Sequence, residues 1–143
     1  MPSHTYAGPI LLTVAYIGLY YGSIVHVART KFRLGAAYQA RGEKFDRYDG
    51  KDREMLAADR QQLNTLEHMP PFLVLLWLNA VLVGTTWATA VGAAYLASRL
   101  LYPFVMGPKL GRSVRAPILL ATVPGYLVML AFCVALVRTA LGY

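Results

Sequence analysis

Three polar residues in the stretch DRQQLNTLEHMPPF, residues 59–72, have the types and spacing of a ligand-binding site. Arg60, Asn64 and Glu67 follow an i, i+4, i+7 pattern, so on a helix they share one face. The apolar run that follows, residues 72–84, has only 13 residues, whereas a membrane-spanning helix needs about 20. The helix must therefore begin near residue 63. Polar groups then lie at or inside the membrane edge, where such groups usually face a bundle interior or a polar cavity.

A second polar stripe follows later in the chain. Its members are spaced i, i+4, i+7 and i+11: Tyr95, Arg99, Tyr102 and Met106. Arg99 could extend to the membrane interface, or it could pair with Glu67 or with an anionic ligand. Arg115 falls in the first turn of the last predicted helix, where the helix dipole disfavours a cation, and a bound anion would explain its position.

Together these residues offer three arginines, one carboxylate and one amide. Arginine matches carboxylates, and a lone glutamate suits an ammonium group. A ligand with carboxylates, an amine and amides would satisfy the set, and glutathione is such a ligand. An arginine near its sulfur would favour the thiolate, which is the nucleophile in thiol chemistry. The residue types leave a second interpretation equally open, which is an interhelical salt-bridge network without a ligand.

The composition indicates an all-α integral membrane protein. The chain has 143 residues, of which 57% are hydrophobic and 15% charged, and it suits a single four-helix transmembrane domain. The approximate spans are residues 9–30, 53–83, 87–106 and 113–139, with a cytoplasmic loop at 31–52. Within the second span, Asn79 is expected to bond to another helix.

The positive charges follow this topology. Of the 14 Lys and Arg residues, nine lie between Arg29 and Arg60 and four between Arg99 and Arg115. Both groups fall on one side of a four-span bundle, which the positive-inside rule makes cytoplasmic, so both termini should be non-cytoplasmic. This distribution does not indicate nucleic-acid binding. The one cysteine, Cys133, supports no disulfide, and no metal site is predicted.

At this point two motifs resemble the MAPEG family, the membrane-associated proteins of eicosanoid and glutathione metabolism. The pattern Arg60-x3-Asn64-x2-Glu67 followed by Pro71-Phe72-Leu73 is similar to the family's second-helix signature. The pattern Arg99-x2-Tyr102 with Lys109-Leu110 and Arg115 is similar to the end of the third helix and the start of the fourth in its prostaglandin E synthase branch.

The resemblance implies a homotrimer of four-helix subunits, with glutathione bound as co-substrate between subunits near the cytoplasmic face. The contacts carried over are Arg60, Asn64, Glu67, Arg99 and Tyr102, and Arg115 matches the arginine thought to stabilise the thiolate. Met106 and His68 stand where several members carry tyrosine, and Gly111 where the prostaglandin enzyme has arginine. These departures leave any particular eicosanoid activity open.

The expected function is glutathione transfer to lipophilic electrophiles, or reduction of lipid hydroperoxides, by an enzyme in a bacterial inner membrane. The alternative is a non-catalytic membrane scaffold or lipid-binding protein of the same family. A transporter or channel is a third class, which four spans without an evident internal repeat do not favour.

Overall fold

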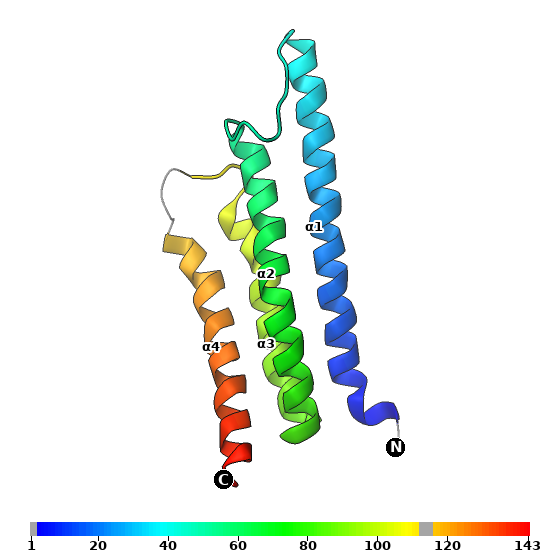
Figure 1. Ribbon diagram of the computed structural model, residues 1–143, viewed down its shortest axis with the longest axis vertical. Helices are drawn as coiled ribbons and strands as arrows, with labels where there is room; N and C mark the ends of the chain where they lie inside the picture. The colour runs from blue at the N-terminus through cyan, green and yellow to red at the C-terminus, as the bar shows by residue number, and fades with distance from the viewer. Residues whose placement is uncertain (1–2, 112–115) are drawn as a thin grey trace.

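The computed structural model describes residues 3–111 and 116–143, and within them the regular structure is entirely helical. A short 3₁₀ helix, η1 (Ser3–Tyr6), leads into α1 (Ala7–Ala40). The other helices are α2 (Arg53–Leu82), α3 (Thr85–Met106) and α4 (Ala116–Ala140). They run alternately up and down, so α1 begins at the end of the bundle where α4 ends (Figure 1). The opposite end, where α1 ends and α2 begins, is called the loop end below.

This arrangement confirms the predicted all-α membrane bundle. Among the described residues, three segments are long and apolar enough to cross a membrane: α1, α2 and Ile118–Ala140 within α4. Much of the apolar surface is outside the bundle, as at Leu120 and Leu127 on α4, and lipid is the solvent that such a surface needs. The α3 helix is not among the three candidates, and its first half is rich in Ala, Thr and Gly.

The first helix is longer than expected. It continues ten residues beyond the predicted end at residue 30 and stops at Ala40, so the predicted loop 31–52 is really residues 41–52. Most of the residues that extend it are good helix formers, and Gly35 is the weakest of them. The extension also packs, because buried Leu34 belongs to one apolar cluster with Met55 and Ala58 of α2, and because Arg33 forms an ion pair with Glu54.

A capped helix start holds the loop end together. The side chain of Asp52 accepts hydrogen bonds from the backbone N–H groups of Glu54 and Met55 at 2.9 and 3.0 Å, which satisfies free donors of the first turn of α2. Its other oxygen accepts from the Tyr38 hydroxyl at 3.0 Å. Partial burial acts to raise the pKa of Asp52, but these hydrogen bonds and the Lys109 charge outweigh it and lower that pKa below its usual value.

An aromatic stack forms the centre of the bundle. The Phe72 ring lies 4.3 Å from that of Tyr95 and 5.2 Å from that of Tyr16, and all three are fully buried. The Tyr16 hydroxyl donates to the Thr65 carbonyl at 3.1 Å. Towards the opposite end, the predicted interhelical role of Asn79 is confirmed, since its amide donates to the Phe132 carbonyl of α4 at 3.3 Å. These contacts fix α2 against α1, α3 and α4.

Candidate functional site

The guanidinium of Arg99 occupies a closed position between α2, α3 and α4. Its Nη1 donates to Asn64 Oδ1 at 3.1 Å and its Nη2 donates to the Ala121 carbonyl at 2.9 Å. Only 3% of Arg99 is exposed, and no carboxylate of the described residues pairs with it, so Glu67 is not its partner. Arg99 therefore joins three helices through neutral acceptors.

Aromatic rings and a glycine shape this position. The Arg99 Cζ atom lies 5.4 Å from the Tyr95 ring centre and 5.7 Å from that of Tyr102, both within the range of cation–π attraction. A Cβ atom at Gly125 of α4 would lie 2.7 Å from Arg99 Nη2, so a side chain there would displace the guanidinium from its present position. The four members of the second polar stripe, residues 95, 99, 102 and 106, are all buried, as their shared face predicts.

The Arg99 contact also sets the orientation of Asn64. Because Oδ1 accepts from Arg99, the amide nitrogen of Asn64 is left as a donor, and Asn64 itself is only half-buried. Arg60 and Glu67 belong to the same face of α2 and are both exposed. Arg60, Asn64 and Glu67 therefore form a half-open polar surface of α2. Arg60 and Glu67 are exposed, whereas Asn64 is fixed on its buried side by the hydrogen bond from Arg99.

The predicted site residues thus divide into two groups. The structure brings together Asn64, Arg99 and Tyr102, and it leaves Arg60 and Glu67 on the exposed surface of α2. Arg115 lies outside the described residues, as do the first residues of the predicted fourth span, so the structure gives no position for it.

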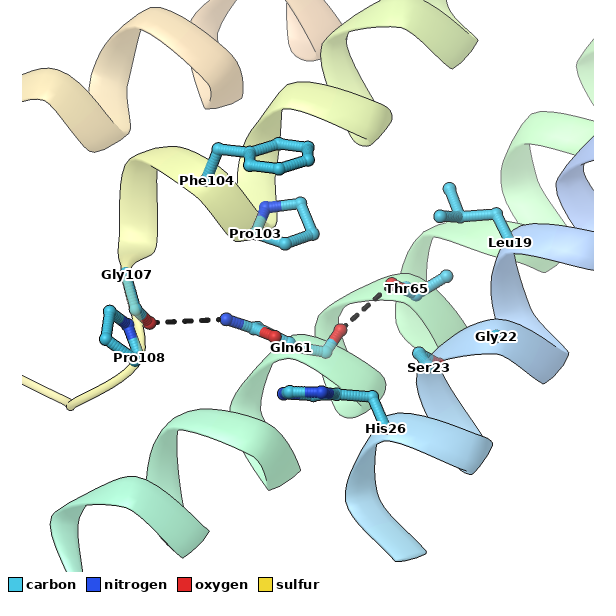
Figure 2. Close-up of a pocket in the computed structure, with 10 residues that line it drawn as sticks. All are labelled: Leu19, Gly22, Ser23, His26, Gln61, Thr65, Pro103, Phe104, Gly107 and Pro108. Carbon is cyan, nitrogen blue, oxygen red and sulfur yellow. Dashed lines mark hydrogen bonds between the residues drawn. The ribbon is translucent and has the colours of Figure 1, made fainter. Parts of the chain in front are cut away.

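A cavity of about 480 Å³ lies on another side of α2, towards α1 and α3 (Figure 2). Its walls combine small and apolar residues with a few polar side chains: Leu19, Gly22, Ser23, His26, Gln61, Thr65, Pro103, Phe104, Gly107 and Pro108. Gln61 donates to the Gly107 carbonyl at 3.4 Å, and the Thr65 hydroxyl donates to the Gln61 carbonyl at 2.9 Å.

The sequence did not predict this cavity. Gln61 and Thr65 are two polar residues spaced i, i+4 on a second face of α2, within the same half of the membrane as Arg60 and Asn64. That spacing was the available signal. The contribution of α3 through Pro103 and Phe104 depends on helix packing, which has no counterpart in the local sequence.

The fold and the buried polar contacts define a polytopic α-helical membrane protein with a buried arginine, Arg99, between its helices. The family model for the MAPEG family matches residues 9–139, so the chain belongs to the MAPEG family. No curated protein and no solved structure gave a significant match. Family membership supports a glutathione-related transferase or synthase function in a membrane, and glutathione use is general among its members.

Proposed function

We propose that the chain binds glutathione on the half-open polar surface of α2 and uses its thiol on lipophilic substrates. Arg60 would bind a carboxylate of the peptide, Glu67 its ammonium group, and Asn64 a peptide carbonyl. Tyr102 would complete the wall behind Asn64. Arg99 would act as a positioning residue, because both of its Nη groups are already bonded within the chain.

The observation that carries this proposal is the accessibility of Arg60 and Glu67. The competing interpretation, a salt-bridge network between helices, requires these two charges to be paired and enclosed. Both are exposed, and neither forms an ion pair with another described residue. Both lie on α2, which is long and apolar enough to cross a membrane, and charged side chains within membrane-spanning segments usually mark a functional site.

The chemistry would follow from stabilising the thiolate. Arg115, by its match to the family motif, is the residue proposed to hold the sulfur as its anion. In conjugation the thiolate attacks an electrophilic carbon, a C–S bond forms, and the leaving group or opened ring oxygen takes the electron pair and then a proton. In peroxide reduction two glutathione molecules become the disulfide while the hydroperoxide becomes an alcohol and water. Conjugation and peroxide reduction both need a lipophilic partner, which would arrive from the bilayer.

The full proposal places this site between subunits of a homotrimer, at the cytoplasmic face of a bacterial inner membrane. It is tested by titrating purified protein with glutathione while following binding heat and thiolate ultraviolet absorbance. Arg60→Ala and Glu67→Ala should each weaken binding, whereas Gln62→Ala, on another face of α2, should not. If the two charge variants bind glutathione as the wild type does, these residues do not form the site.

A non-catalytic membrane scaffold or lipid-binding protein is the second candidate. The contacts of Arg99 with Asn64 and Ala121 favour it, because two nitrogens of that guanidinium join helices within the chain. Wild-type protein that binds no glutathione at millimolar concentration would support this candidate over the enzyme.

A further inference from the structure

We infer that a basic pocket at the loop end binds a small water-soluble phosphate ester. The pocket lies between the end of α1, the start of α2 and the connection from α3 to α4, and four cations line it: Arg41, Lys51, Arg53 and Lys109. Its volume of about 370 Å³ falls in the range of about 300–1,000 Å³ typical of small-molecule sites. The pocket shares no residue with the proposed glutathione surface, and the inference does not depend on glutathione binding.

The two carboxylates that line the pocket already have partners. Asp52 accepts hydrogen bonds from the backbone N–H groups of Glu54 and Met55 and from the Tyr38 hydroxyl. Glu54 forms its ion pair with Arg33, which does not line the pocket. Neither carboxylate forms an ion pair with one of the four lining cations. The acidic residues therefore leave the positive charge of the pocket open to an anion from outside.

Two of the cations are held side by side by the backbone. The Nε atom of Arg53 donates to the Leu110 carbonyl at 2.7 Å, and the Leu110 N–H donates to the Arg53 carbonyl at 3.0 Å. These reciprocal bonds join the start of α2 to the connection that carries Lys109. Within the described part of the chain, the Nη groups of Arg53 and the Lys109 ammonium form no hydrogen bond or ion pair, so they can both bind a ligand.

The other two cations have only weak partners. Lys51 pairs with Asp49 at 3.4 Å and Arg41 pairs with Glu43 at 3.1 Å, and both pairs are close in sequence and open to water. Exposed ion pairs of this kind contribute little to stability, so an anion with higher charge can compete for these cations. The Arg41 Cζ atom also lies 4.5 Å from the Tyr38 ring centre, which holds the guanidinium at the pocket wall.

The mixture of donors favours phosphate over carboxylate. Two arginines offer planar forks and two lysines offer compact charges, and together they suit the several oxygens and double charge of a phosphate monoester. A carboxylate has only two oxygens and one charge, so it satisfies fewer of these groups. Leu34 and Ala37 add an apolar part to the wall, which would contact the organic group of the ester.

The position of the pocket along the helices favours a ligand dissolved in water. The predicted spans end near residue 30 of α1 and begin near residue 63 of α2. At a rise of about 1.5 Å per residue, Tyr38 lies about 12 Å beyond the first limit and Asp52 about 17 Å beyond the second. A layer of lipid head groups is only about 5–8 Å thick on each side of the hydrocarbon core. The pocket accordingly opens to the aqueous phase, above the phosphates of the lipids.

The test is isothermal titration of phenyl phosphate into the full-length protein in phosphatidylcholine nanodiscs. Benzoate is the matched ligand, because it carries the same ring with a carboxylate in place of the phosphate. Lys109→Gln and Arg53→Gln each remove one cation of the pocket. Lys44→Gln is the control variant, because Lys44 is an exposed lysine of the loop 41–52 that does not line the pocket.

We expect phenyl phosphate to bind the wild type at millimolar concentration or below, at least fivefold more tightly than benzoate. Lys109→Gln and Arg53→Gln should each weaken this binding at least fivefold, whereas Lys44→Gln should stay within twofold. Unchanged binding in Lys109→Gln would overturn the inference, and this variant decides alone if Arg53→Gln does not fold. Equal binding of benzoate and phenyl phosphate would refute the preference for phosphate.

Competition identifies the source of the phosphate and separates the pocket from the glutathione site. Inorganic phosphate should displace phenyl phosphate, whereas dihexanoyl phosphatidylglycerol, a short-chain lipid, should not. Displacement by this lipid would refute the water-soluble ligand and assign the pocket to a lipid head group. Saturating glutathione should leave the affinity for phenyl phosphate unchanged, and displacement by glutathione would show that the pocket belongs to the glutathione site.

Discussion

Replacing Arg99 by methionine separates a positioning role from direct contact with glutathione. Methionine keeps an apolar stem and removes both hydrogen bonds, to Asn64 Oδ1 at 3.1 Å and to the Ala121 carbonyl at 2.9 Å. Asn64 then loses the partner that directs its amide nitrogen outwards. If Arg99 acts only through Asn64, the loss of Arg99 should lower the affinity for glutathione by the same factor as the loss of the Asn64 contact.

The expected magnitude follows from ordinary hydrogen-bond energies. A neutral hydrogen bond contributes about 0.5–1.5 kcal/mol, which corresponds to roughly a 2- to 10-fold change in affinity. A guanidinium bonded directly to a glutathione carboxylate would contribute about 1.5–3 kcal/mol, or roughly 10- to 150-fold. Stability is a poorer measure here. Arg99→Met loses two charge-assisted hydrogen bonds, which lowers the free energy of unfolding. It also removes the cost of burying a guanidinium that is only 3% exposed, which raises that free energy, so the two effects oppose each other.

The assay is a double-mutant cycle on the dissociation constant of glutathione. Arg99→Met and Asn64→Ala should each weaken binding roughly 2- to 10-fold, and the double variant should be no weaker than either alone. Arg60→Met provides the matched control, because Arg60 is exposed and its effect should multiply with that of Asn64→Ala. If the Arg99 and Asn64 effects multiply in the double variant, the positioning role is refuted, and Arg99 contacts glutathione directly.

Three further changes test the remaining assignments. Arg115→Ala should lower turnover far more than glutathione affinity, measured by steady-state kinetics, and equal losses in both would count against a role at the thiolate. Gly125→Val should lower unfolding stability in detergent by about 1–3 kcal/mol, because its side chain meets the Arg99 guanidinium, whereas Gly18→Val should lower it far less. Asp52→Ala should cost about 1 kcal/mol at neutral pH. Since the folded pKa of Asp52 lies below 3.8, its contribution is present above about pH 4 and is lost as the pH falls through the folded pKa, so chemical denaturation of wild type and variant should converge in acid.

The helices themselves could be predicted, because long apolar runs bounded by glycine and charge define them. The bounds of α2 and α3 differ from the predicted spans by at most two residues. The extension of α1 could not be predicted, since its support comes from α2. Leu34 packs on Met55, and Tyr38 bonds to Asp52, 14 residues later. Tertiary contacts of this kind override the local turn signals of Gly35 and its neighbours.

The candidate site could be predicted only in part, because its burial and its hydrogen-bond partners also depend on contacts between helices. Helical spacing correctly placed Arg99 and Tyr102 on one face, but spacing does not say how deeply a face is buried. The acceptor that fixes Arg99 on α4 is a backbone carbonyl, that of Ala121, and any residue type could supply it. The sequence indicated the membrane interface, a charge pair with Glu67 or an anionic ligand for Arg99, and it did not indicate the neutral acceptors on α2 and α4 that the structure shows.

The loop-end half of α2 presents three different surroundings within five residues. Arg60 is exposed, Gln61 lines the cavity, and Asn64 bonds to Arg99. A helix in lipid satisfies its own backbone, so its polar side chains must find partners in the protein, in a ligand or at the interface. Arg60 and Asn64 lie on one face of α2 and Gln61 on another, and each of the three side chains has a different environment. Loss of glutathione binding in Arg60→Ala, with the unfolding transition in detergent unchanged, would show that this exposed residue acts in binding, because a general defect in the helix would change both.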